Sequence, residues 1–354
     1  MAQIEPNKEF FEANIKMLKC LQISMNPPEV DVGTTPADVV FEHNKMKLLR
    51  YRPLAERKYG PPLLIVYANI NKPYILDLQP DRSVIRRFLE NGVDVYMIEW
   101  GDTTEADMFL TIEDYIDSYI RRAVDYVRKE SGAKKISLMG YCIGGFFSTI
   151  FASLYPDRIR NLIVMSAPIN FDTDKGPLHV WTKHIDPQKI VRAFNNCPPE
   201  FLNTSFLLLG PLENTCLKYI KLCDNIENEE YVKNFFRMEK WLHDDVAVPG
   251  RFYEEYIKNG YQQNLLIKNE LVIGKKKVNL KNIKMPLLVL VGTNDNLTPP
   301  DATTPLIKAV RSKDKKILEN VSGHIGVSVG SYAHKHLWPR VVDWLQKRSD
   351  KVGD

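Results

Sequence analysis

The sequence predicts an α/β protein with a mostly parallel central sheet, helices on both faces and an inserted, mainly helical cap. Helical segments alternate with short, nearly continuous apolar runs of strand length, as β-α-β units require. After residue 170 this alternation stops, and it resumes with the apolar run at 287–291. The earlier apolar runs lie at 63–68, 93–98, 136–139 and 162–166.

Local signals place the other elements of the first half. Prolines at positions 27, 28 and 36 interrupt the start of the chain, so residues 1–35 are expected to form a helix followed by an irregular lead-in. Thr111 is the expected N-cap of the strongest helical pattern in the chain. The remaining expectations are one or two antiparallel strands at 40–53, and helices at 83–90, 112–127 and 143 to about 154.

Residues 171–283 are predicted to form a helical cap inserted into the sheet domain. This segment has few strand-like runs but many prolines and aromatic residues. The core is then expected to comprise residues 36–170 and 284–354. Its last elements are expected as a strand at 287–291, a helix near 304–310, a strand around 316–318 and a helix from about 337 to 347.

Composition excludes several classes of function. The 48 basic and 44 acidic residues are scattered, and the net charge of +4 predicts neither a nucleic-acid partner nor a charged membrane surface. No apolar run reaches the roughly 18–20 residues of a membrane span, and the start of the chain lacks the apolar region of a signal peptide. A cytoplasmic location is therefore expected.

The cysteines indicate neither a disulfide framework nor a zinc site. Their number is odd and no C-x-x-C pair occurs, so all of them are expected as free thiols in a reducing compartment. No metal or resident cofactor is predicted. The five cysteines are Cys20, Cys142, Cys197, Cys216 and Cys223.

One glycine-rich turn predicts a nucleophile. Gly140-Tyr141-Cys142-Ile143-Gly144 follows an apolar strand and precedes a helix, which is the context of the G-x-S-x-G turn in the α/β-hydrolase fold, here with cysteine in place of serine. Flanking glycines permit the tight backbone of such a turn. Cys142 would stand at a helix N-terminus, where the helix dipole and a nearby base favour the reactive thiolate. A buried structural cysteine is the weaker alternative.

The same fold orders its catalytic residues as nucleophile, acid and histidine. Asp295 follows the strand at 287–291, where the acid is expected, and His324 lies in the loop after the last strand. Taken alone, Asp295 could be a turn or helix-capping residue, and His324 could be a surface histidine without a catalytic role. Together with the cysteine turn, they predict a Cys142, Asp295 and His324 triad.

An oxyanion hole requires backbone N–H groups that face the developing negative charge. The first is expected from Ile143, directly after the nucleophile. The second is expected from the loop after the first core strand, where Ile70 is the choice and Asn69 the close alternative.

Several motifs together resemble one family, the polyhydroxyalkanoate synthases. The cysteine turn is similar to the modified lipase box of that family, and residues 66–78 are similar to its stretch after the first core strand. Residues 95–101 resemble its D-V-Y-x-x-D-W-G segment, departing at Glu99, where aspartate is usual. Gly323-His324-Ile325-Gly326 matches its histidine motif, and the likeness covers roughly residues 36–345.

The resemblance implies the short catalytic subunit of a two-subunit (class III or IV) synthase. Its substrate would be (R)-3-hydroxyacyl-coenzyme A, chiefly short-chain, and its products a growing polyester and free coenzyme A. A second synthase subunit and homo-oligomerisation are implied, at the surface of cytoplasmic polymer granules. The resemblance also carries the catalytic roles over to Cys142, Asp295 and His324.

Two alternatives stay open. A cysteine-nucleophile hydrolase, of the dienelactone-hydrolase or thioesterase kind, would share the fold but release a free acid. A non-catalytic granule protein would keep the fold without chemistry, although it would have no need for all three triad residues.

Overall fold

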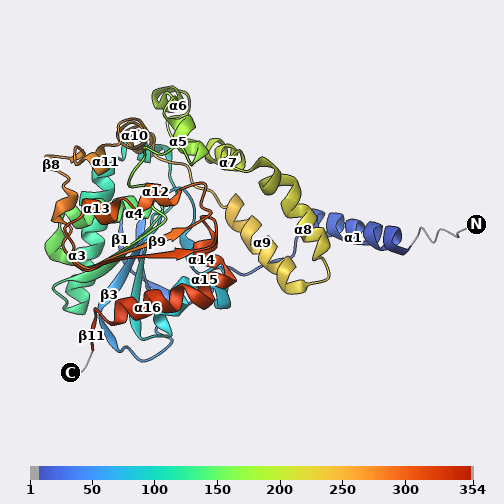
Figure 1. The fold of residues 1–354 in the computed structure, drawn as a ribbon, viewed down its shortest axis with the longest axis horizontal. Helices are drawn as coiled ribbons and strands as arrows, with labels where there is room; N and C mark the ends of the chain where they lie inside the picture. Colours follow the sequence, from blue (N-terminus) through green and yellow to red (C-terminus); the bar gives the residue numbers. More distant parts are fainter. Residues whose placement is uncertain (1–7, 352–354) are drawn as a thin grey trace, which may run out of the picture.

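A computed structural model describes residues 8–351 and shows a nine-stranded sheet at the centre of the molecule (Figure 1). Its main path runs β1-β2-β4-β3-β5-β6-β9-β10, and β11 pairs with β3. The strands are β1 (Ala37–His43), β2 (Met46–Tyr51), β3 (Tyr59–Val66), β4 (Val93–Glu99), β5 (Ile136–Tyr141), β6 (Ile159–Met165), β9 (Leu287–Gly292), β10 (Lys315–Asn320) and β11 (Asp350–Lys351).

The six strands from β4 to β10 along this path are parallel, whereas β1, β2 and β11 pair antiparallel. The mostly parallel sheet of the sequence prediction is therefore confirmed. Register decides which loops meet: Val66 pairs with Gly140, and Gly292 pairs with Asn320. The loops that follow these strands consequently emerge side by side at one edge of the sheet.

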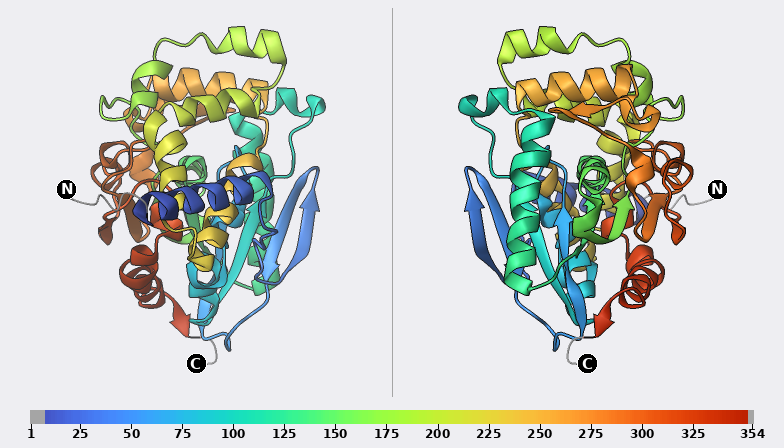
Figure 2. Two further views of the ribbon diagram at one scale, coloured as in Figure 1. Left: turned by 90° about the vertical axis from the view of Figure 1, so that its right-hand side faces the viewer. Right: turned by 90° about the vertical axis from the view of Figure 1, so that its left-hand side faces the viewer.

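Helices cover both faces of the sheet (Figure 2). α2 and α16 pack together on one face, while α3 and α4 pack on β3, β5 and β6 from the other. The helix expected at 112–127 begins as a π-helical segment, Asp114–Ile120, before α3. The core helices are α2 (Val84–Leu89), α3 (Arg121–Ser131), α4 (Ile143–Leu154), α12 (Pro300–Thr303), α13 (Leu306–Ala309), α14 (Gly326–Val329), α15 (Ser331–His336) and α16 (Trp338–Gln346).

Between β6 and β9 the chain is mainly helical and lies above the edge where the parallel strands end (Figure 2). The exact boundaries 171 and 283 stay a prediction. This cap contains α5 (Pro177–Thr182), α6 (Pro187–Phe194), α7 (Pro199–Leu207), α8 (Lys218–Asp224), α9 (Glu229–His243), α10 (Gly250–Tyr256), α11 (Leu265–Lys268) and the hairpin β7 (Val272–Ile273) and β8 (Lys276–Lys277).

Short 3₁₀-helical and π-helical segments complete the fold. The 3₁₀ segments are Pro73–Leu76, Pro80–Arg82, Glu105–Phe109, Pro156–Arg158 and Leu280–Asn282, and further π-helical segments are Glu213–Leu217 and Ile257–Gln262.

An arm projects from the core, formed by α1 (Lys8–Met25) together with α8 and α9 (Figure 1). It has a small apolar core of its own, comprising Cys20, Leu222, Ile226, Val232 and Phe236. The expectation that every cysteine is a free thiol is wrong here, because Cys20 and Cys223 form a disulfide. These residues are 203 positions apart, so only the packing of α1 on α8 reveals their proximity.

Candidate active site

Cys142 sits on the sharp turn between β5 and α4, at the edge where the parallel strands end. Its φ of 55° is a left-handed conformation that costs a non-glycine residue free energy. The turn is held by hydrogen bonds from Cys142 N to Met165 O at 3.0 Å and from Gly145 N to Cys142 O at 2.9 Å. A side chain at Gly144 would clash with the backbone of Val66, so close packing against β3 requires glycine there.

The structure brings Asp295 and His324 together beside this turn. Their loops follow β9 and β10, which end in register, and a hydrogen bond from Asn294 N to Ser322 O at 3.0 Å joins the two loops. His324 Nδ1 lies 2.7 Å from Asp295 Oδ2. The other carboxylate oxygen, Oδ1, accepts hydrogen bonds from the backbone N–H groups of Leu297 at 3.0 Å and Thr298 at 2.7 Å.

Electrostatics set the proton affinity of His324. Burial lowers the pKa of this imidazole, but the Asp295 carboxylate and the neighbouring Cys142 outweigh burial and raise the pKa from 6.5 to about 10. Both side chains of the pair are nearly inaccessible to solvent. Nδ1 faces the carboxylate, which leaves the other ring nitrogen, Nε2, for proton exchange with a reacting group.

Tyr141 is a site residue that sequence reasoning did not assign. Its hydroxyl donates a hydrogen bond to the backbone carbonyl of His324 at 3.0 Å, and its ring stacks on the imidazole with centroids 5.2 Å apart. A buried tyrosine is expected to find such a partner. The only signal in the sequence is its place directly before Cys142, which does not reveal a contact 183 residues away.

The predicted oxyanion donors lie on both sides of Cys142. Ile143 is the first residue of α4, where backbone N–H groups have no partner within the helix. Of the two alternatives after β3, Ile70 lines the same cavity as Cys142, while Asn69 is buried and is not part of the cavity lining. Their role in catalysis stays a prediction.

A cavity of about 80 Å³ lies above Cys142, roofed by the cap. Its walls are mostly apolar and aromatic, and they offer few hydrogen-bond partners to water. Several wall residues, including those of α7, carried no distinctive signal in the sequence. The lining comprises Ile70, Cys142, Ile143, Pro168, Leu178, Thr182, Ile185, Phe201, Leu202, Ser205, Phe206, Val248, Phe252, Tyr253, Tyr256, Ile257, Tyr261, Leu297 and Thr298.

The cap histidine His179 does not join this site. It is fully buried, and its Nδ1 lies 3.2 Å from the carbonyl oxygen of Phe171.

Within residues 8–351, no group of histidine, cysteine, aspartate and glutamate side chains is placed to hold a metal ion. Over the same residues, no helix is both long and apolar enough to cross a bilayer.

A cysteine on a strand-to-helix turn, facing an aspartate-histidine pair, places the chain in the α/β-hydrolase fold, and comparison with known proteins agrees. Residues 61–331 match the family described as alpha/beta hydrolase fold. A hydrolase from Pseudomonas aeruginosa superposes with a TM-score of 0.54 at 13% identity, covering 89% of this chain and 99% of that one. A thermophilic esterase from Thermogutta terrifontis gives 0.52 at 15% identity, covering 90% and 100%.

Sequence relatives define the family more closely. Residues 12–88 match the family described as Poly-beta-hydroxybutyrate polymerase (PhaC) N-terminus. The chain is 47% identical over 328 residues to the poly(3-hydroxyalkanoate) polymerase subunit PhaC of Haloferax mediterranei, covering 92% of this chain and 67% of that protein. It is 39% identical over 350 residues to the subunit of the same name from Allochromatium vinosum, covering 98% and 99%. The chain therefore belongs to the poly(3-hydroxyalkanoate) polymerase subunit PhaC family, which confirms the resemblance drawn from the motifs.

Proposed function

We propose that this chain polymerises (R)-3-hydroxyacyl-coenzyme A into polyester, with Cys142 carrying the acyl group. The observation that carries the proposal is the position of Cys142. It lies on a strained turn, beside the hydrogen-bonded His324 and Asp295 and beneath a mostly apolar cavity. Relatives named as polymerase subunits, at 37–47% identity, support the same reaction.

The first step is acyl transfer to the enzyme. His324 takes the proton of the Cys142 thiol, and the sulfur attacks the thioester carbonyl of the substrate. The carbonyl oxygen becomes an oxyanion, which the N–H groups of Ile143 and Ile70 stabilise. The bond from the carbonyl carbon to the coenzyme A sulfur then breaks, and the leaving sulfur takes a proton from His324. One thioester replaces another, so the exchange is nearly balanced in energy.

The second step forms the ester bond of the polymer. The 3-hydroxyl of another acyl unit loses its proton to His324 and attacks the Cys142 acyl thioester. The carbon–sulfur bond breaks as the ester forms, and the Cys142 sulfur leaves as a thiolate beside the protonated His324. Both carboxylate oxygens of Asp295 already accept hydrogen bonds, from His324 and from two backbone N–H groups. This favours a role for Asp295 through His324 rather than directly on the hydroxyl.

Water is the competing nucleophile, and its exclusion separates a polymerase from a hydrolase in this fold. The apolar wall of the cavity supports transfer to a hydroxyl over hydrolysis. A cysteine-nucleophile hydrolase or thioesterase is the alternative, and its product would be free 3-hydroxyacid. The solved structures of similar fold bear on the fold alone.

The proposal also covers assembly and location. The chain would act with a second synthase subunit and form homo-oligomers, at the surface of polymer granules. The relatives are named as subunits, which supports assembly with further chains. A short-chain acyl group is the proposed substrate, as the resemblance to the polyhydroxyalkanoate synthases implies.

The test is release of free thiol from (R)-3-hydroxybutyryl-coenzyme A, for the wild type and for Cys142→Ala, with the product examined for insoluble polyester. Thiol release with polyester in the wild type, and loss of both in a folded variant, is the expected result. Thiol release with only 3-hydroxybutyrate would instead identify a hydrolase. Equal activity in the variant would remove Cys142 from the chemistry.

A further inference from the structure

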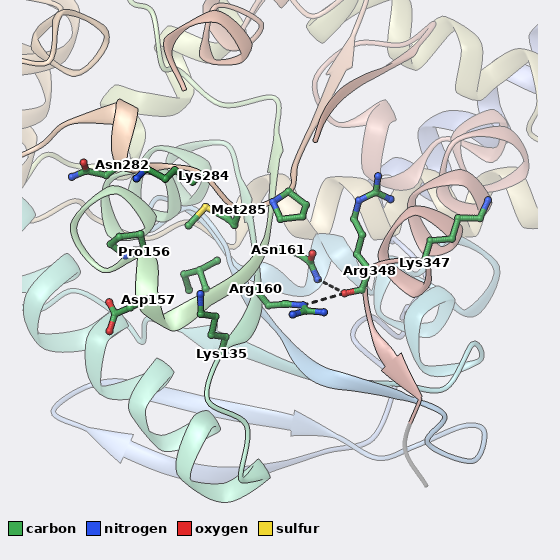
Figure 3. A pocket seen from close by; sticks show the side chains of 12 residues that line it. Lys135, Pro156, Asp157, Arg160, Asn161, Asn282, Lys284, Met285, Lys347 and Arg348 are labelled. Carbon is green, nitrogen blue, oxygen red and sulfur yellow. Dashed lines mark hydrogen bonds between the residues drawn. The ribbon is translucent and has the colours of Figure 1, made fainter. Parts of the chain in front are cut away.

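Figure 3 shows a second hollow, of about 750 Å³. Its lining includes Lys135, just before β5, so it lies at the opposite edge of the sheet from Cys142, which follows β5. It is formed where β5 and β6 begin, by the loop that leads into β9 and by the end of α16. Lys135 and Cys142 lie at opposite ends of β5, so roughly 23 Å of strand separates the hollow from the nucleophile. The lining comprises Lys135, Pro156, Asp157, Ile159, Arg160, Asn161, Asn282, Lys284, Met285, Pro286, Lys347 and Arg348.

Cationic side chains dominate this lining: five lysines and arginines face a single carboxylate, Asp157. They come from four segments that are distant in the sequence, and only the folded structure brings them into one hollow. Within residues 8–351, Lys135 and Lys284 have no ion-pair partner, and both are exposed. The other three pair with carboxylates outside the lining: Arg160 with Asp350 at 3.3 Å, Lys347 with Asp343 at 2.8 Å and Arg348 with Asp314 at 2.7 Å.

Asn161 supplies a buried acceptor in the lining. Its side chain is fully buried, and Nδ2 donates to Ser137 Oγ at 3.0 Å and to the carbonyl oxygen of Arg348 at 3.4 Å. The other amide atom, Oδ1, has no hydrogen-bond partner among the described residues. Figure 3 shows this amide between Met285 and Arg348, with only the nitrogen bonded to the Arg348 carbonyl. Because this oxygen is buried, it lies in the polar floor beneath the hollow and is not itself open to a ligand.

The shape and polarity of the hollow restrict the ligand. Its volume lies within the roughly 300–1,000 Å³ of small-molecule sites. Pro156, Ile159, Met285 and Pro286 contribute apolar atoms to the lining, and two unpaired lysines can pair with more than one negative charge. A ligand that combines a heterocycle with at least two phosphate charges meets both conditions.

We propose that this hollow binds a nucleoside polyphosphate group. Lys135 and Lys284 would contact the phosphates, and the apolar side chains of the lining would pack against the base. Two sources share this chemistry, a free nucleotide and the nucleotide end of coenzyme A. The site is separate from the proposed catalytic cysteine, and it does not depend on the proposed function.

The test is calorimetric titration with ADP of the full chain and of two double variants. Lys135→Gln with Lys284→Gln removes the two unpaired cations. Lys275→Gln with Lys308→Gln removes two exposed lysines elsewhere and leaves the net charge equal to that of the first variant. We expect the first variant to bind ADP at least tenfold more weakly than the wild type, and the second to bind like the wild type. All four substituted lysines are exposed, so both double variants should stay folded.

Three results would overturn the proposal: no binding of ADP to the wild type at millimolar concentration, equal affinity in both double variants, or adenosine binding as tightly as ADP. Coenzyme A in a parallel titration distinguishes the sources. Whichever of ADP and coenzyme A loses more affinity in the Lys135→Gln, Lys284→Gln variant is the ligand that this hollow fits better.

Discussion

The proposed chemistry depends on single residues at the edge of the sheet beside Cys142, and each is held by the backbone turn or by hydrogen bonds. Cys142 is held at a φ of 55° by a turn whose glycines pack directly on neighbouring strands. Tyr141 and Asp295 hold His324 from two sides, through its carbonyl and its ring nitrogen. Such fixed geometry lowers the cost of reorganisation during the reaction.

Asp295→Asn tests the orienting role of the carboxylate. The substitution keeps the shape of the side chain but removes the charge that faces the imidazole Nδ1. We expect thiol release from 3-hydroxybutyryl-coenzyme A to fall by about 10²-fold or more, because the imidazole loses its orientation and the stabilisation of its charged form. Asp224→Asn, at an exposed position, is the matched control. Activity within twofold of the wild type would remove Asp295 from the mechanism.

The same variant tests the raised pKa of His324 through stability. The folded-state pKa of about 10 lies above the unfolded value of 6.5, so between these pH values the folded protein binds more protons. The free energy of unfolding of the wild type should therefore fall as pH rises from 6.5 to 10, by on the order of 1 kcal/mol per pH unit from this group. Asp295→Asn should show a shallower fall in urea denaturation. Parallel curves for the two proteins would contradict the assignment.

At the scale of elements, a buried carboxylate connects three segments near the start of the core. Asp77 accepts hydrogen bonds from Thr35 N at 2.9 Å, from Thr35 Oγ1 at 2.7 Å and from Ser83 Oγ. Ser83 in turn caps α2, accepting from Arg86 N at 3.0 Å. The contact therefore joins the N-terminal lead-in, the loop after β3 and the first helix of the core.

Asp77→Ala should destabilise the protein by about 3 kcal/mol or more, because it leaves buried donors without a partner. Asp77→Asn keeps one acceptor oxygen and should cost less. Chemical denaturation of both variants beside the wild type measures the difference. The specific activity of the folded fraction should stay unchanged, since Asp77 lies outside the cavity lining. An unfolding free energy within about 0.5 kcal/mol of the wild type would contradict this role.

Helix α7 forms part of the cavity wall, and its apolar residues test the exclusion of water. Phe206→Ser should admit water to the acyl-enzyme and raise the share of free 3-hydroxybutyrate relative to polyester. Phe194→Ser, on α6 at a position 57% exposed, is the matched control and should leave the product ratio unchanged. Product analysis by chromatography measures both. An unchanged ratio in Phe206→Ser would mean that this wall does not keep water out.

At the scale of the whole molecule, the cap and the sheet domain differ in how far they can move when a substrate enters. The cavity of about 80 Å³ is far below the roughly 300–1,000 Å³ typical of ligand sites, so the cap has to move to admit an acyl-coenzyme A. In the sheet below, β5 and β9 are fully buried and β6 is buried except at Arg160, so the sheet offers no such freedom.

Hydrogen exchange measures this motion directly. A non-reactive thioether analogue of the substrate should change the exchange rates of amides in α7 and α10, while those of β5 and β6 stay the same. The comparison uses Cys142→Ala, so that no covalent adduct forms. Identical exchange in the cap with and without the analogue, at saturating concentration, would argue for a static cap.

The elements that were predicted correctly from the sequence are those whose signal lies in neighbouring residues. Periodicity placed β4, β9 and α16 within two residues of their observed ends, because burial of each strand or helix leaves a local pattern. Of the helix predicted near 304–310, the structure has only the short α13, which begins directly after Pro305, while α12 lies before the predicted range. Proline is tolerated at the start of a helix but not in its interior. The hairpin β7–β8 and the short strand β11 are two residues long per strand, too short for a periodic signal.

The sequence by itself determined the α/β alternation, the cysteine on its glycine-rich turn and the family, since all of these depend on neighbouring residues or on short motifs. Only the tertiary structure decided the contact of Asp295 with His324, the support of His324 by Tyr141, the disulfide between Cys20 and Cys223 and the cationic hollow around Asn161. Each of these joins segments far apart along the chain. Their proximity depends on strand order, register and helix packing, which no local pattern encodes.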